Sequence, residues 1–317
     1  MLGCLLVLLL AACGGWDPIS FSPSTATPAA TGTPAQVSTP LPPTPRVDPT
    51  ERALTLSPTP TPGASPPDTW QTLPVIPTQV SPRVGEIYRS GLAMGNQAHI
   101  FSRIGDCAST APEFLVGFGQ NYNLGAYASL QPAIDYFQGS FGRPSLAAKA
   151  GLNTAGLLTT LWTDPQCGKN ETLLDCQYRL DKPSLAFIAL GTNEAYYVHH
   201  DASSFEHNLR IILDDTIAKG IVPILATKAD NVEGDNSINA TIARLAEEYQ
   251  LPLWNFWLAA QPLPDHGLVD PEHLTTVSYN NFTDFSLPNS LQYGMQVRNL
   301  TALQMLDLLR QQLAATR

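Results

Sequence analysis

The residues from Gly14 to Pro82 constrain the fold most, because they hold 17 of the 28 prolines in the chain. The stretch is otherwise rich in Thr, Ser and Ala. Such a composition has too few apolar side chains to offset the entropy lost on ordering, and its prolines favour extended conformations. We therefore predict a disordered linker at residues 13–82. The folded domain must then come from residues 83–317, and these 235 residues are enough for one large α/β domain.

The apolar residues from Leu2 to Leu10 predict an export signal. The run is too short to cross a bilayer, which takes about 20 residues, but it has the length of a signal-peptide core. Leu10-Ala11-Ala12-Cys13 resembles a bacterial lipoprotein signal. This implies that residues 1–12 are removed, that Cys13 is acylated, and that the protein is exported and anchored to a bacterial membrane. A plain secretory signal with an incidental cysteine stays open, as does a start upstream of Met1, because no Lys or Arg precedes the apolar run.

The cysteines beyond the signal divide by location. Cys167 and Cys176 bracket a short polar loop, and the oxidising compartment that export implies favours joining them. We predict that disulfide. Cys107 is then the remaining thiol and needs an explanation of its own.

Four apolar segments, residues 99–104, 185–190, 221–227 and 253–256, predict the strands of a parallel sheet. Continuous apolar strands imply burial on both faces. Helical patterns lie between and after them, with apolar residues at 205, 209, 212 and 217, at 238, 242, 245 and 249, and at 300, 306 and 309. Ser203 or Ser204 is expected to cap the first of these helices, and Gly220 to end it. The alternation predicts an α/β fold, a three-layer α/β/α sandwich around a mostly parallel sheet.

Three short segments carry a candidate site. Gly105-Asp106-Cys107 and Gly191-Thr192-Asn193 each follow a predicted strand, so both reach the sheet edge where such folds bind ligands. Asp270 and His273 have the spacing that lets a carboxylate reach the imidazole Nδ1 and fix its tautomer. Together they offer the nucleophile, base, orienting acid and oxyanion donor that covalent ester hydrolysis needs. Asp265-His266 competes for the role of acid and base, but adjacent residues point apart too readily to hold that geometry.

The order of these segments resembles the SGNH hydrolases, also called the GDSL esterase family. The family's blocks read Gly-Asp-Ser, a glycine, Gly-x-Asn-Asp and Asp-x-x-His. The resemblance extends from about Ile100 to His273 and implies a flavodoxin-like fold. It places Cys107 at the nucleophile, with His273 as the base and Asp270 as its acid.

The resemblance also implies three donors to the oxyanion. They are the backbone N–H of Cys107, the backbone N–H of Gly156 and the side chain of Asn193. Asn153-Thr154-Ala155-Gly156 is the best match for the glycine block, and Gly151 is the second candidate for its glycine.

Two positions depart from the family pattern. Glu194 stands where an aspartate is usual, which alters the hydrogen bonding around its turn. Cys107 stands where the family has serine. A thiol is a good nucleophile and a neighbouring imidazolium lowers its pKa, but sulfur forms longer bonds, and a displacement of about 1 Å can lower a rate about a hundredfold.

Two functions therefore stay open. One is an exported, lipid-anchored SGNH-type hydrolase that cleaves small acyl groups from an ester, including esters of carbohydrates, with a Cys-His-Asp triad. The other is a catalytically inactive surface module of the same fold that binds glycan or peptide.

The expected partners are a small acyl-ester or glycan-ester substrate and, through the lipid anchor, the membrane. No metal and no organic cofactor is expected. Nucleic acid is not expected as a partner, because the net charge is −10 and phosphate binding depends on clustered Lys and Arg. Trp254, Phe256 and Trp257 fit core and sheet-edge packing better than a sugar-binding surface.

Overall fold

Four strands form one parallel sheet in the computed structural model, which describes residues 69–110, 112–161, 164–198, 201–277 and 281–314. In sheet order they are β1 (Gln97–Gly105), β2 (Pro183–Ala189), β3 (Val222–Ala226) and β4 (Leu253–Trp254). All four predicted strands are confirmed, β4 being shorter than expected. Because the strands are parallel, their carboxyl ends meet at one edge. The predicted signal, Cys13 and most of the predicted linker lie outside the described residues.

An isolated bridge continues the sheet beyond β1. Gly105 pairs with Ala148 in parallel, the N–H of Gly105 donating to the Ala147 carbonyl at 2.9 Å. The segment that follows β1 therefore pairs with one side of β1 at Ala148, and the next strand, β2, pairs with its other side. Such a reversal is the topological switch point at which open α/β sheets bind ligands. The fold thus favours a site just beyond Gly105.

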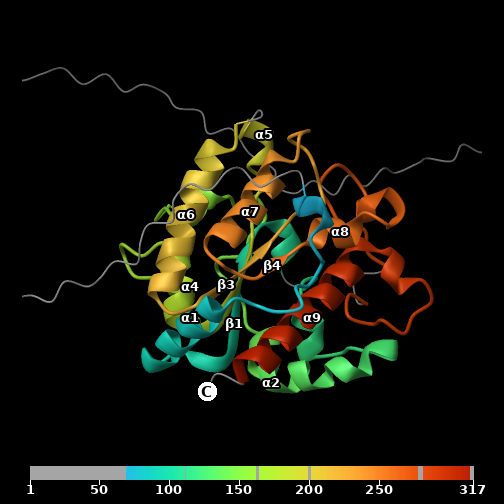
Figure 1. The fold of residues 1–317 in the computed structure, drawn as a ribbon, viewed down its shortest axis with the longest axis horizontal. Helices are drawn as coiled ribbons and strands as arrows, with labels where there is room; N and C mark the ends of the chain where they lie inside the picture. The colour runs from blue at the N-terminus through green and yellow to red at the C-terminus, as the bar shows by residue number, and fades with distance from the viewer. Residues whose placement is uncertain (1–68, 111, 162–163, 199–200, 278–280, 315–317) are drawn as a thin grey trace, which may run out of the picture. The chain divides into compact units, whose positions relative to one another are not determined.

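Helices cover both faces of the sheet, as Figure 1 shows. The α-helices are α1 (Pro82–Ala93), α2 (Gln131–Phe141), α3 (Thr154–Leu157), α4 (Leu173–Asp181), α5 (Ala195–Val198), α6 (Ser203–Ala218), α7 (Ser237–Glu248), α8 (Phe256–Ala260) and α9 (Gly294–Ala314). Short 3-10 turns are η1 (Trp70–Thr72), η2 (Cys107–Ser109), η3 (Val116–Gly119), η4 (Gly125–Leu130), η5 (Pro264–Gly267) and η6 (Ser290–Gln292). No helix in the described ranges is both long and apolar enough to cross a lipid bilayer.

The two faces of the sheet pack against different helices. On one face, α2 and α9 pack together over the aromatic rings of Phe101 and Trp254. On the other, Ser102 of β1 donates a hydrogen bond to Asp181 of α4, and Tyr178 of α4 reaches Thr216 of α6 at 3.0 Å. The predicted three-layer α/β/α fold is confirmed.

An aromatic cluster fills the layer between the sheet and α9. Phe114 stacks on Trp254 at a ring distance of 5.9 Å, and Phe187 meets Trp254 edge-on at 5.6 Å. Trp254 and Phe256 are fully buried. Burying each such ring contributes about 2 to 3 kcal/mol. Both residues therefore serve packing, as the sequence indicated.

The ends of α6 show one wrong prediction and one correct one. The helix begins at Ser203, but its N-cap is Ala202, and the Asp201 carboxylate accepts from the Ser203 N–H at 2.9 Å. Neither Ser203 nor Ser204 caps it, because the helical conformation starts at Ser203 itself. Gly220 ends the helix as predicted, with φ +66° and its N–H donating to the Ile217 carbonyl.

The folded part starts before the predicted boundary at Arg83. Trp70 is buried, and its ring packs edge-on against Trp257 at 5.0 Å. The Asn255 amide donates to the carbonyls of Trp70 and Leu73 at 3.0 and 2.9 Å. Residues 69–81, which we call the N-terminal strap, therefore pack beside the carboxyl end of β4. The strap shares the Pro-rich composition of the predicted linker, so its place in the domain could not be seen from composition.

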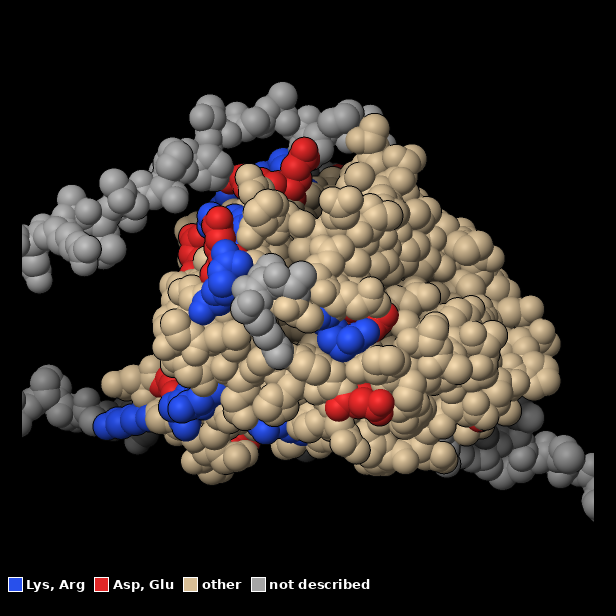
Figure 2. Space-filling model, turned by 60° about the horizontal axis from the view of Figure 1, so that its bottom comes forward, with Lys and Arg blue, Asp and Glu red and all other residues tan. Residues whose placement is uncertain are grey.

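Charged side chains of both signs occur on the face drawn in Figure 2, along one side of a broad uncharged area. Ion pairs join neighbouring helices of the described structure. The Arg210 guanidinium of α6 contacts Glu248 of α7 at 2.6 Å and Glu206 at 2.8 Å. Pairs of this exposure contribute about 0 to 1 kcal/mol each, so burial of the core dominates the stability of the layers.

Candidate functional site

Cys107 lies in a tight turn at the carboxyl end of β1. A Cβ atom at Gly105 would lie 2.4 Å from Ser109 Oγ and 2.5 Å from the Ala189 carbonyl, so only glycine fits there. Asp106 then caps η2 by accepting from the Ala108 N–H at 3.2 Å. Cys107 is partly exposed, whereas Ser109 is buried. The turn therefore leaves the thiol, and not the nearby serine, at the sheet edge.

A buried arginine, Arg298, donates hydrogen bonds to this turn. Arg298 of α9 donates to the Ala108 carbonyl at 3.1 Å and to Ser109 Oγ at 3.3 Å. Burial lowers its pKa to about 10, while the neighbouring Asp106 and Cys107 favour its charged form. Burial likewise raises the pKa of Asp106 to about 7, although Arg298 opposes that shift. The Cys107 turn thus packs against a buried pair of ionisable groups, Asp106 and Arg298.

Asn193 follows β2 in a turn that also requires glycine. Gly191 has φ +131°, and a Cβ there would lie 2.6 Å from the Cγ2 of Ile238. The Asn193 side chain donates to the Leu152 carbonyl at 2.9 Å. Because a carboxamide has two N–H donors, one remains for another acceptor. Asn193 therefore keeps a donor available at the carboxyl edge.

Glu194 joins the Asn193 turn to the start of α3. It is buried, and its Oε1 accepts from the Thr154 N–H at 2.5 Å. Burial raises its pKa, against the hydrogen bond from Thr154. The Glu194 side chain thus connects the Asn193 turn to the segment that begins α3.

The two candidate glycines, Gly156 and Gly151, differ in the hydrogen bonds made around them. The N–H of Gly156 donates to the Asn153 side chain at 2.7 Å, in the N-terminal cap of α3. That hydrogen bond occupies the donor that the resemblance assigned to the oxyanion. Gly151, with φ +76°, directly precedes Leu152, the residue that Asn193 holds. The bonding pattern therefore favours Gly151 over Gly156.

Asp270 and His273 are in contact, as their spacing predicted. The His273 Nδ1 lies 2.8 Å from Asp270 Oδ2 and 3.0 Å from Oδ1. Desolvation raises the pKa of Asp270, but hydrogen bonds from the N–H groups of Glu272 and His273 and from the imidazole outweigh it and lower the pKa. In the competing pair, His266 Nδ1 faces the Gln261 carbonyl at 3.1 Å. A backbone carbonyl therefore holds His266, and a carboxylate holds His273.

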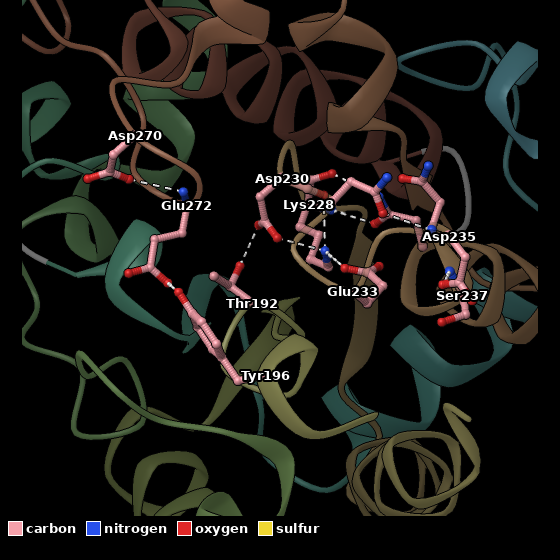
Figure 3. A network of polar contacts seen from close by, with 12 residues as sticks. Thr192, Tyr196, Lys228, Asp230, Glu233, Asp235, Ser237, Asp270 and Glu272 are labelled. Carbon is pink, nitrogen blue, oxygen red and sulfur yellow. Dashed lines mark hydrogen bonds and ion pairs between the residues drawn. The ribbon is translucent and has the colours of Figure 1, made fainter. Parts of the chain in front are cut away.

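The three segments converge on one small cavity at the carboxyl edge. Its lining includes the neighbours of each predicted residue, namely Asp106 and Ala108 beside Cys107, Thr192 beside Asn193, and Glu272 and Leu274 on either side of His273. Tyr196 donates to Glu272 at 2.8 Å and so ties the segment after Asn193 to the histidine loop (Figure 3). Cys107, Asn193 and His273 do not themselves line the cavity, so the sequence-predicted residues share a region of the molecule through their neighbours.

Three residues of this region were missed by the sequence analysis. Lys228 and Asp230, from the loop after β3, and Arg298 also line the cavity. The loop matches no motif, and a single arginine in a long helix carries no pattern. The one signal that could have found Lys228 and Asp230 is their position directly after a buried strand.

Cys167 and Cys176 form the predicted disulfide, with the sulfurs 2.07 Å apart. Within the described part of the chain, they also form with Glu171 one group of potential metal ligands. Since their sulfurs are joined to each other, they are not thiolates and do not offer a zinc site.

No family model matches the chain, and no curated protein matches it. Similar solved structures include a catalytic mutant of an acetylxylan esterase from Geobacillus stearothermophilus, with 14% identity over 65% of this chain and 93% of that chain and a TM-score of 0.39. A GDSL-like lipase from Bacteroides thetaiotaomicron has 15% identity over 71% and 98% of the two chains and a TM-score of 0.36. A mutant of the esterase AlinE4 has 22% identity over 58% of this chain and 89% of that chain and a TM-score of 0.33. Because each TM-score is below 0.5, the function must be argued from this chain's own residues.

Proposed function

We propose that the domain is an SGNH-type ester hydrolase that works through a Cys-His-Asp triad. The observation that carries the proposal is the Asp270–His273 pair, held at 2.8 Å beside a cavity that residues flanking Cys107 and Asn193 also line. A carboxylate on Nδ1 leaves Nε2 to act as the base, which is the arrangement that covalent acyl transfer uses.

The reaction has two steps with balanced proton transfers. His273 takes the thiol proton of Cys107, the sulfur attacks the carbonyl carbon, and a tetrahedral oxyanion forms. On its collapse the C–O bond breaks, and His273 gives the proton to the leaving alcohol. Water, deprotonated by His273, then attacks the thioester; the C–S bond breaks, the acid leaves and the thiol is restored. The buried Arg298 charge near Cys107 favours the thiolate in the first step.

The oxyanion would receive hydrogen bonds from the backbone N–H of Cys107, from the second N–H of Asn193 and from the N–H of Gly151. Gly151 takes the role first expected of Gly156, whose N–H is used in the α3 cap. Removing one such donor costs about 3 to 4 kcal/mol of transition-state stabilisation.

The substrate is a small acyl ester, and a carbohydrate ester suits the surroundings of the site. Tyr196 and Tyr197 are 53% and 57% exposed, and their hydroxyls are held by Glu272 and Asn153. Fixed, exposed rings of this kind can stack on a sugar.

The protein acts outside the cytoplasm, held to the membrane through Cys13. The Cys167–Cys176 disulfide supports this location, because disulfides persist in oxidising compartments. Mass spectrometry of the mature N-terminus should find an acylated Cys13, and a mature chain that starts elsewhere would end this part of the proposal.

A catalytically inactive binding module is the second candidate, favoured by the cysteine at the nucleophile position. Short-chain nitrophenyl esters and thioesters, assayed with wild type, Cys107→Ser and Cys107→Ala, separate the two functions. The hydrolase predicts activity in wild type, its loss in Cys107→Ala and a loss of at least about a hundredfold in His273→Ala. A wild type without activity, together with a Cys107→Ser variant that gains it, would support the binding module.

A further inference from the structure

A buried cluster of charged side chains lies directly behind the Asn193 turn. Lys228 Nζ contacts Asp230 Oδ1 at 2.7 Å and Glu233 Oε2 at 2.6 Å (Figure 3). All three side chains are at most 7% exposed. They come from the loop after β3, next to the strand that ends in the Asn193 turn. The reaction scheme above uses none of them.

The cluster meets the turn at two points. Thr192 donates its hydroxyl to Asp230 Oδ2 at 2.8 Å. The stem of Lys228 passes behind Gly191, where a Cβ would lie 3.5 Å from Lys228 Cδ. The residues immediately before Asn193 are therefore held both by a hydrogen bond and by packing.

The other side of the cluster is fixed to α7. The Lys228 N–H donates to Asn239 Oδ1 at 2.8 Å, and the Asn239 amide donates back to the Lys228 carbonyl at 3.0 Å. Asn239 is fully buried. A continuous chain of contacts thus runs from α7 through Lys228 and Asp230 to Thr192.

Stability alone does not account for this arrangement. Burying a charge costs several kcal/mol before pairing, and apolar residues of similar volume are often as stabilising as a buried ion pair. Hydrogen bonds and ion pairs, in contrast to apolar contacts, fix a direction as well as a distance. The directed contact here ends one residue before the proposed oxyanion donor.

We propose that Lys228, Asp230 and Thr192 are positioning residues that hold Asn193 for the oxyanion. The inference rests on the proposed function and adds residues that act through Asn193. A catalytic group must be held within about 0.5 Å of its working position. Because the Asn193 donor acts in the transition state, loosening the turn lowers kcat and leaves KM nearly unchanged.

Thr192→Val tests this with Thr192→Ser as the matched control. Valine keeps the shape of threonine and removes the hydroxyl, whereas serine keeps the hydroxyl. We expect Thr192→Val to lower kcat by about ten- to a hundredfold with KM within about twofold. The Thr192→Ser variant should retain most of the wild-type kcat. An unchanged kcat in Thr192→Val, or an equal loss in both variants, overturns the proposal.

A second measurement keeps the test valid if the protein hydrolyses nothing. The side-chain NH₂ signal of Asn193 can be assigned by NMR from its disappearance in Asn193→Asp. We expect the signal to shift or broaden in Thr192→Val and to stay in place in Thr192→Ser. An undisturbed signal in Thr192→Val contradicts the positioning role, whereas missing hydrolysis with a disturbed signal contradicts the proposed function alone.

Discussion

At the scale of single residues, the burial of Asp106 should make the stability of the protein depend on pH. Its carboxyl group, in the residue before Cys107, is buried, and burial raises its pKa to about 7. An ordinary Asp in an unfolded chain titrates near 4. Between these values the folded protein binds a proton that the unfolded chain does not. Asp106 therefore contributes stability at low pH that is lost as the pH rises toward 7.

Asp106→Asn should remove this dependence, because asparagine stays neutral and keeps the oxygen that caps η2. We expect wild type to lose up to about 4 kcal/mol of unfolding free energy relative to the variant between pH 4 and pH 8. Urea unfolding of both proteins across this range measures the difference, in which the shared titrations cancel. A wild type that instead gains stability relative to the variant would show that Asp106 is ionised and paired with Arg298.

At the scale of elements, the N-terminal strap is the segment whose role in stability is most easily measured. Trp70 is buried in it, whereas Leu73, three residues later, is 42% exposed. Trp70→Ala should lower the unfolding free energy by about 3 kcal/mol, since it removes a buried indole and its contact with Trp257. Leu73→Ala is the control, expected to change it by less than about 1 kcal/mol. Equal effects of the two substitutions in urea unfolding would argue against the packing described for the strap.

The strands and the N-terminal strap differ in how well they could be predicted from the sequence. β1, β2 and β3 were found because a strand buried on both faces must be apolar along its length. The strap was not, because its few anchoring residues, such as Trp70, lie within a stretch whose average composition is that of a linker. Local pattern thus predicts elements that are regular, and it fails where an irregular segment is ordered only by tertiary contacts.

The candidate site divides in the same way. Cys107, Asn193 and His273 were predicted because their short motifs follow strands or have a set spacing. Lys228 and Arg298 were not, since each acquires its place only when distant segments pack. Gly156 shows a third case: the motif is present, but the Asn153 cap uses the donor that the motif implied. Sequence motifs therefore locate candidate reactive groups more readily than the groups that hold them in place.

At the scale of the whole molecule, the proposed site and the disulfide involve different residues of the sheet's surroundings. The proposed site is at the carboxyl edge. The disulfide joins Cys176 of α4 to Cys167, and α4 ends at Asp181, where the chain turns back into the amino end of β2. Stability and chemistry should therefore be separable in this protein.

Cys167→Ser with Cys176→Ser tests that separation. Opening a loop whose ends are 9 residues apart should cost about 3 kcal/mol of stability through chain entropy. Because the disulfide contributes no residue to the cavity at the carboxyl edge, kcat and KM should stay within about twofold of wild type at temperatures where the variant is folded. Denaturant unfolding and ester hydrolysis, measured on the same samples, give both quantities. A loss of activity in fully folded variant protein would mean that the two edges are coupled through α4 and β2, and that the sheet does not isolate the site from changes at its far end.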